Sequence, residues 1–202
     1  NPEVDYVKAK VENETWILAK PLAKHVIEVI TENKFTIEET FKGKKLEGTK
    51  YTHPLYDELS KYYKDIEKVS KKAFTVVMSK EYVDTESGTG LVHMAPGCGP
   101  EDYDVGHRNG IPPLNMLDEQ GFYPKDTKAY AGIQAKSEDH KFIELFEKAN
   151  SLIASSKVAH DYAHCDRCKT AVIFRATKQW FFKVEDLKKK MIAENKKIKW
   201  QP

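Results

Sequence analysis

The stretch SGTGLVHMAPGCGPEDYDVG, residues 87–106, brings glycines, a histidine, a thiol and several carboxylates close together in the chain. Gly88-Thr89-Gly90 predicts a sharp turn, because glycine accepts a positive φ and lets a ligand approach the backbone closely. The apolar pair Leu91-Val92 predicts a short strand that ends at His93. The segment PGCGP, residues 96–100, contains too many breakers for a helix or a central strand, so we expect a loop.

A helix is predicted to begin directly after this loop. Pro100 suits a first helical turn, the acidic residues after it favour the positive N-terminal end, and Gly110 ends the pattern. His93 and Asp102 are therefore expected to face one another across the loop. Each has an ordinary structural explanation when taken alone, Asp102 as a partner of the helix dipole and His93 as a satisfied structural histidine. Together they indicate a site that suits a cationic amine.

Length and composition limit the classes of protein that fit. The chain has 202 residues, of which 40% are hydrophobic, enough for one substantial core or for one core with a small appendage. Lys and Arg number 33 against 31 Asp and Glu, so bulk charge gives no reason to expect a nucleic-acid binder, and any RNA contact must come from local patches. No apolar run is long enough to span a bilayer, and the first residues lack a signal-peptide pattern, so a cytoplasmic protein without a membrane partner is expected.

The cysteines and the first residue of the chain indicate its compartment and its origin. The chain has three cysteines, two of them in a Cys-x-x-Cys pair, which fits a reducing compartment better than a disulfide framework. It begins at Asn1-Pro2 without a methionine, which we interpret as a piece of a longer polypeptide.

The N-terminal half reads as short strands and one helix. Alternating apolar residues predict a hairpin of residues 6–11 and 15–19, and Pro21 predicts the start of an amphipathic helix that ends near Asn33. Further strands are predicted over residues 35–41 and 74–78. The lysine-rich segment 56–70 is either a helix with a solvated face or a loose insertion.

The C-terminal half is predicted to change character near residue 157. A tight turn at Asp118–Gly121 precedes a strand at Phe122-Tyr123, and a helix follows over residues 137–150. Residues 152–158 are strand-like. We therefore expect a compact domain over residues 1–157 and a separate segment over residues 158–202, which ends in a basic amphipathic helix between Lys183 and Lys199.

The run GTGLVHMAPGCGPEDYDVG resembles the editing-domain signature of the class I aminoacyl-tRNA synthetases for branched aliphatic amino acids, and most closely the isoleucyl enzymes. Gly48, Tyr51, Pro54 and Leu55 are similar to a second family segment. A third likeness lies in HCDRCKT, residues 164–170, followed by Arg175-Ala176-Thr177 and Gln179-Trp180-Phe181. The likeness covers almost the whole chain.

This resemblance implies a fold. It implies a mainly β protein with helices (α+β), in which a β-barrel editing domain of the valyl, isoleucyl and leucyl type occupies residues 1–157. A return connection with the Cys-x-x-Cys knuckle and the basic helix would follow over residues 158–202.

The resemblance also implies a function, the hydrolysis of valine wrongly esterified to the tRNA for isoleucine. Asp102 would hold the α-ammonium group and His93 would line the pocket beside the side chain, as the catalytic residues. A positioned water would attack, with no cofactor and without Cys98 as a nucleophile. The substrate-binding residues would be Gly88, Thr89, Gly90, Met94, Ala95, Pro96, Gly97 and Tyr103.

Metals and partners follow from the same resemblance. Cys165 and Cys168 would form half of a zinc site, whose other ligands lie upstream in relatives, and His160 or His164 could also contribute. ATP would bind only in a synthetic core whose motifs this sequence lacks. The expected partners are the 3′ end of the tRNA for isoleucine and the rest of the synthetase chain, in a monomer.

Two alternatives and one departure from the family pattern remain. A non-catalytic zinc-knuckle module that binds RNA fits the knuckle and the basic helix. An editing domain of a valyl or leucyl enzyme would make His93 incidental, since those enzymes typically carry Lys or Met near that position. The threonine-rich strand that supplies one pocket wall in the family is absent, so we expect this chain alone to edit poorly or not at all.

Overall fold

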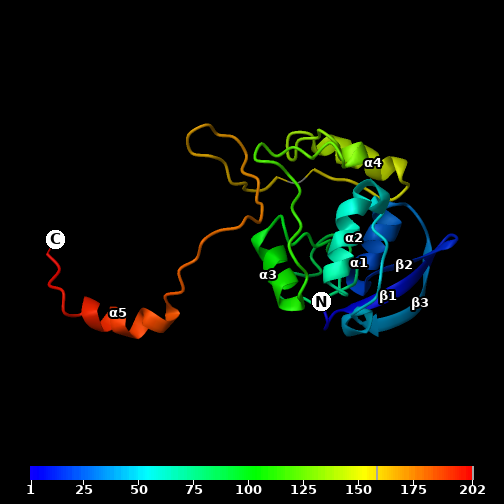
Figure 1. Ribbon diagram of the computed structural model, residues 1–202. Helices are drawn as coiled ribbons and strands as arrows, with labels where there is room; N and C mark the ends of the chain where they lie inside the picture. Colours follow the sequence, from blue (N-terminus) through cyan, green and yellow to red (C-terminus); the bar gives the residue numbers. More distant parts are fainter. Residues whose placement is uncertain (158, 202) are drawn as a thin grey trace.

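Three strands form a single open antiparallel sheet in the computed structural model, which describes residues 1–157 and 159–201. The strands are β1 (Asp5–Val11), β2 (Glu14–Ala19) and β3 (Phe35–Lys42), in the order β2-β1-β3 (Figure 1). Tyr6 lies opposite Ala19 on one side and Phe41 on the other. The predicted hairpin and the predicted third strand are confirmed.

The first core forms where a helix covers this sheet. Helix α1 (Lys20–Lys24) begins with Pro21 in its first turn and continues directly as the π-helix η1 (His25–Ile30). The helix predicted from Pro21 is confirmed, although it ends at Ile30. The buried residues of this core come from β1, from β2, from the helix and from Leu46: Tyr6, Val7, Ala9, Val11, Leu18, Ala19, Leu22, Ala23, Val26, Ile27 and Leu46.

A second, smaller core lies between α2 (Ser60–Val69), α4 (Asp139–Lys148) and the 3-10 turns η3 (Tyr56–Leu59) and η4 (Lys128–Tyr130). The body also contains the 3-10 turn η2 (Gly43–Leu46) and helix α3 (Pro100–Asn109). Leu55, Leu59, Tyr130 and Ile133 are buried together, and α2 and α4 add aromatic side chains to them. The predicted helices at Pro100 and after Ser137 are confirmed, and segment 56–70 is helical.

Several predicted strands are wrong. Residues 74–78 form one isolated bridge, Lys50 to Thr75, in which the Tyr51 amide donates to the Phe74 carbonyl at 3.0 Å and the Val76 amide to the Thr49 carbonyl at 2.9 Å. The Gly48 amide also donates to the Val76 carbonyl at 2.9 Å. Phe74 has a φ of 53°, which interrupts the extended backbone. Leu91-Val92 and residues 152–157 form no strand, and Phe122 makes a single bridge to Gln134. Residue 158, also predicted as strand, lies outside the described residues.

These interruptions bear on the fold class. The α+β class is confirmed, but among the described residues the sheet has three strands and an open edge, so a closed β-barrel and a mainly β composition are not seen. The apolar segments that would extend a barrel pair through isolated bridges instead of continuous ladders.

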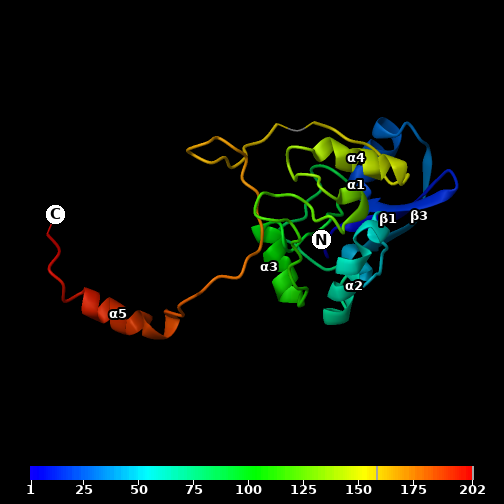
Figure 2. The same cartoon turned by 45° about the horizontal axis from the view of Figure 1, so that its top comes forward.

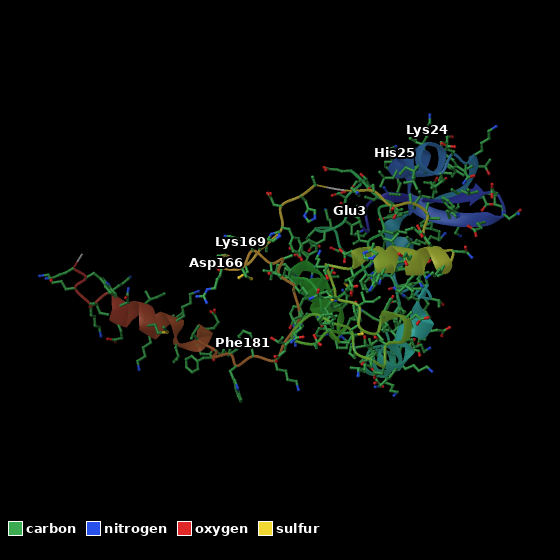
Figure 3. The ribbon with its side chains drawn as sticks, turned by 90° about the horizontal axis from the view of Figure 1, so that it is seen from above. Glu3, Lys24, His25, Asp166, Lys169 and Phe181 are labelled. Carbon is green, nitrogen blue, oxygen red and sulfur yellow. The ribbon has the colours of Figure 1, made fainter. Side chains whose placement is uncertain are left out.

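The C-terminal segment leaves the body and extends away from it. Around the knuckle, His164 pairs with Ala171, and the chain then touches the body where the Ala176 amide donates to the Gly97 carbonyl at 2.9 Å. Turn η5 (Glu185–Leu187) and helix α5 (Lys188–Asn195) lie far from the sheet in both views (Figures 1 and 2). Phe181 lies on the extended segment that connects η5 and α5 to the body (Figure 3). The predicted basic helix is confirmed over a shorter range.

None of the described helices has both the length and the apolar character that a membrane crossing would need.

Candidate functional site

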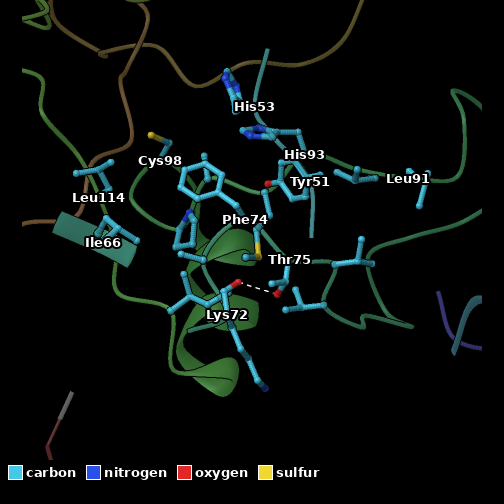
Figure 4. A pocket seen from close by; sticks show the side chains of 18 of the residues that line it. Tyr51, His53, Ile66, Lys72, Phe74, Thr75, Leu91, His93, Cys98 and Leu114 are labelled. Atoms are coloured by element: carbon cyan, nitrogen blue, oxygen red, sulfur yellow. Dashed lines mark hydrogen bonds between the residues drawn. The ribbon is translucent and has the colours of Figure 1, made fainter. Parts of the chain in front are cut away.

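A cavity of about 590 Å³ lies where the sheet, α2 and the segment after the GTG turn meet. Its walls are mainly apolar and aromatic, and they include Tyr51, Tyr63, Phe74, Val76, Met78, Leu91, Met116, Tyr123 and Phe142. Figure 4 shows Tyr51, Phe74 and Leu91 among the side chains that line it. Two imidazole rings, those of His53 and His93, also line it. An apolar cavity of this size with few polar groups is typical of a small-ligand site.

The residues proposed from the sequence divide into two sets. Gly90, His93, Met94, Ala95 and Pro96 line the cavity. The others are not among its lining residues: Gly88, Thr89, Gly97, Asp102 and Tyr103. Five of the ten residues predicted for catalysis and substrate binding therefore line the cavity, and the other five do not.

The GTG turn is held in place by the first core. The Ala19 amide donates to the carbonyl of Thr89 at 2.8 Å, and the Tyr6 hydroxyl donates to the carbonyl of Gly90 at 2.7 Å. Gly90 has a φ of 72°, and a Cβ there would lie 2.5 Å from the Cβ of Ala19. Only glycine fits this position without displacing β2.

Gly97 has a structural role in the loop. It is buried, and a Cβ at this position would lie 1.9 Å from the carbonyl oxygen of Leu114. Its own carbonyl accepts hydrogen bonds from Asn115 Nδ2 and from the Ala176 amide, both at 2.9 Å. The close approach of residues 114–115 therefore fixes the shape of the loop that follows the cavity wall.

Asp102 is not itself a lining residue, but its charge acts on two residues that line the cavity, His93 and Cys98. It stands in the first turn of α3, is half-buried, and its Oδ2 accepts the Ala95 amide at 3.0 Å. Within the described part of the chain this is its one hydrogen bond, so Oδ1 carries none. The carboxylate thus orients the wall residue Ala95 and keeps one oxygen for a further donor.

His93 stands at the rim of the cavity. Its ring keeps an accessible surface, yet the protein atoms around it lower its pKa through desolvation, while the charge of Asp102 acts in the opposite direction. Because the pKa of His93 is lowered from its ordinary value, the imidazole is neutral at pH 7. Since the charge of Asp102 acts on His93, the two residues lie close together, as the sequence predicts.

His53 is a site residue that the sequence did not reveal. It is buried, with 8% of its surface exposed, and its Nδ1 accepts the Leu55 amide at 3.1 Å. Burial, followed by the proximity of His93, lowers its pKa to about 4. Its neighbours Tyr51, Pro54 and Leu55 were noted in the sequence for their likeness to a family segment, but nothing there indicated that the histidine faces the cavity.

Cys98 lines the cavity and keeps an exposed surface. The protein atoms around it raise the pKa of its thiol through desolvation, and the negative charge of Asp102 raises that pKa further. Since the thiolate is the nucleophilic form, a thiol with a raised pKa is a poor nucleophile at neutral pH.

The knuckle offers two thiols. Cys168 Sγ lies 3.2 Å from Thr170 Oγ1, and hydrogen bonding to Thr170 lowers the pKa of the Cys168 thiol to about 7. In residues 1–157 and 159–201, no group of three or more His, Cys, Asp or Glu side chains is placed to hold a metal ion. A structural zinc site needs four ligands, so the knuckle residues do not form a complete one.

Comparison with known proteins places the chain among synthetases. The family model described as tRNA synthetases class I (I, L, M and V) matches residues 3–202. An isoleucine–tRNA ligase of Pyrococcus abyssi is 43% identical over 207 residues, covering 100% of this chain and 19% of that protein. The corresponding ligases of a Thermoanaerobacter species and of Fervidobacterium nodosum are 39% and 40% identical, again over 100% of this chain, which covers 20% and 21% of them. The chain thus spans about a fifth of the length of these curated relatives.

Proposed function

The chain belongs to the class I tRNA synthetases of the isoleucine, leucine, methionine and valine group, and on that premise we propose that it is the editing region of an isoleucine–tRNA ligase. In this function it hydrolyses the ester of valine on the 3′ end of the tRNA for isoleucine.

Physical chemistry supplies the need for such a region. Valine lacks one methylene of isoleucine, and one methylene in an apolar pocket is worth only about 1–3 kcal/mol of discrimination. A synthetic site therefore accepts some valine. A second site that admits the smaller side chain and hydrolyses its ester removes the error.

The observation that carries the proposal is the wall of the cavity made by Gly90 and residues 93–96. It joins a glycine turn, whose backbone allows close approach of a nucleoside, to an apolar cavity of about 590 Å³ that suits an aliphatic side chain. Gly88 and Thr89 continue the same turn, and Tyr103 follows Asp102 on α3. We assign the terminal adenosine to the backbone of the turn and the valine side chain to the apolar wall.

Two side chains take the polar roles. Asp102 Oδ1 binds the α-ammonium of valine, while Oδ2 keeps its bond to the Ala95 amide. His93 at the rim excludes the longer isoleucine side chain. A water then adds to the ester carbonyl carbon, the bond to the ribose oxygen breaks, and that oxygen leaves with a proton, assisted by the neighbouring ribose hydroxyl.

Other groups belong to other parts of the ligase. Cys165 and Cys168 supply two thiols, so a closed zinc site would need ligands from elsewhere in the protein, and ATP would bind in the synthetic core. The partners are the tRNA for isoleucine and the remainder of the ligase chain, which we expect to work as a monomer.

Deacylation assays test the function. In a ligase of the relatives' full length that contains residues 1–202, preformed Val-tRNA should be hydrolysed and Ile-tRNA spared, and Asp102→Ala should abolish the hydrolysis. Asp104→Ala is the matched control, because Asp104 is exposed on the same helix and pairs with Arg108 at 3.2 Å. The 202-residue chain alone should act slowly or not at all.

The opposite result has a clear meaning. If the full-length ligase hydrolyses neither ester, the editing function is wrong, and binding of tRNA to this chain without chemistry becomes the function to measure. If Asp104→Ala is as damaging as Asp102→Ala, the role assigned to Asp102 is wrong.

A further inference from the structure

His53 is a buried titratable group that the proposed reaction does not use. It lies in the loop between η2 and η3, and its Nδ1 accepts the Leu55 amide at 3.1 Å. An imidazole nitrogen that accepts a hydrogen bond carries no proton, so the proton of the neutral ring must be on Nε2. The loop therefore fixes both the charge state and the tautomer of His53.

Three rings surround His53, each from a different part of the chain. The centroid of the His93 ring lies 5.3 Å away, that of Tyr63 on α2 lies 5.7 Å away, and that of Phe146 on α4 lies 6.1 Å away. His53 and His93 stand side by side at the edge of the cavity (Figure 4). Of the groups packed around the pair, Tyr63 and Asp102 can ionise, and Phe146 cannot.

We propose that His53 is a positioning residue for His93, whose ring it orients by packing against it and by closing the inner side of that ring to water. The inference rests on the proposed editing function, because the ring so oriented is the one that separates valine from isoleucine. His53 itself need not touch the substrate.

The environment of His53 explains why it can hold this role at neutral pH. Protonation would remove the acceptor of the Leu55 amide and would place a cation in a buried aromatic setting beside a second imidazole. Burial lowers the pKa of His53 to about 4, so the neutral, hydrogen-bonded ring is kept at pH 7. The contact with His93 is therefore between two neutral rings.

Two substitutions separate the two features of His53. His53→Asn keeps an acceptor near the position of Nδ1 but removes most of the ring, whereas His53→Phe keeps the ring and removes the acceptor. The measurement is an NMR pH titration of the 202-residue chain, which gives the titration midpoint of the His93 ring. We expect His53→Asn to raise the His93 midpoint by about 0.5–1 pH unit, because water reaches the ring, and His53→Phe to leave it within about 0.3 unit.

A second variant protects the test against loss of folding. Tyr63→Leu removes one of the rings that pack against His53, so it should shift the His93 midpoint in the same direction by a smaller amount. The exposed His25→Asn is the matched control. The inference is overturned if His53→Asn leaves the His93 midpoint unchanged, or if His53→Phe shifts it equally.

The activity of the full-length ligase separates this inference from the function on which it rests. His53→Asn should raise the hydrolysis of Ile-tRNA relative to Val-tRNA about tenfold, a loss worth ~1.4 kcal/mol of discrimination, while His53→Phe changes the ratio less than about threefold. An unmodified ligase that hydrolyses neither ester refutes the editing function, and the NMR result stands by itself. An active ligase whose selectivity does not respond to His53→Asn refutes the inference alone.

Discussion

The helix that covers the sheet and the helix near the C-terminus have similar sequence patterns and opposite surroundings. Both carry apolar side chains, yet Ile27 on η1 is 0% exposed and Ile192 on α5 is 49% exposed. Trp180, in the chain that leads to α5, is fully exposed. Apolar periodicity thus predicts a helix and its apolar face, but the partner that buries the face must come from elsewhere.

The difference has a thermodynamic consequence. Side chains on η1 contribute the free energy of removal from water, because β1 supplies a complementary surface. Among the described residues, α5 has no such surface, so its apolar side chains contribute little to the stability of the folded body. Substitutions in the two regions should therefore have unequal effects.

The largest effect is expected for matched isoleucine substitutions. Ile27→Ala should lower the free energy of unfolding by about 2–5 kcal/mol, because it leaves a cavity in the first core. Ile192→Ala should change it by less than about 0.5 kcal/mol. Denaturant unfolding measures both, and equal losses would show that α5 is packed in solution.

The next effect concerns the loop behind the cavity. Gly97→Ala would place a Cβ 1.9 Å from the Leu114 carbonyl oxygen, so we expect a loss of about 1–3 kcal/mol from displaced backbone. Gly99→Ala is the matched control, because a Cβ there meets nothing within 4 Å. Thermal unfolding of both variants checks the prediction, which fails if Gly97→Ala is as mild as its control.

Acid should weaken the body through His53. Its folded pKa of about 4 lies below the ordinary value of 6.5, so the unfolded chain binds more protons between these values and stability falls as pH decreases from about 6.5 to 4. The slope from one such group is at most ~1.4 kcal/mol per pH unit. Unfolding of His53→Phe across this range should show a shallower slope than the unmodified chain, and His25→Phe should not. An unaltered slope in His53→Phe would contradict the burial of a neutral His53.

The smallest effect is expected from removing the C-terminal segment. The last described contact with the body in this part of the chain is the Ala176 amide on Gly97, and residues 178–201 are exposed throughout. A chain that ends at Thr177 should therefore melt within about 2 °C of the longer chain. A fall well beyond that would mean that the segment packs on the body.

The sequence predicted correctly those helices and strands that depend only on residues close to them in the chain. The hairpin around Glu12–Glu14, the helix after Pro21 and the helix from Pro100 to Gly110 all follow from turn residues, caps and apolar spacing. The strand predicted at residues 74–78 was wrong, because its apolar run is typical of a buried strand but the segment serves as a cavity wall. Its hydrogen-bond partners at residues 48–51 lie across a long connection, which a local pattern does not reveal.

The candidate site was predictable in part for the same reason. The cavity wall of Gly90 and residues 93–96 lies within one stretch, so its residue types could be interpreted together. The hydrogen bond from the Ala95 amide to Asp102 forms only when α3 folds back toward the loop before it. His53 is positioned by three rings that come from distant segments. A pattern along one segment contains no information about such contacts.

The hydrogen bond from Tyr6 to the Gly90 carbonyl joins positions that are 84 residues apart. Contacts between distant residues close large loops and tend to form late. During translation, β1 leaves the ribosome long before the GTG turn does, so the strand waits for its partner while the intervening chain is made. The cavity can therefore be completed only after residue 90 has emerged, and nascent chains stopped before that point should lack a ligand site even if their sheet has already formed.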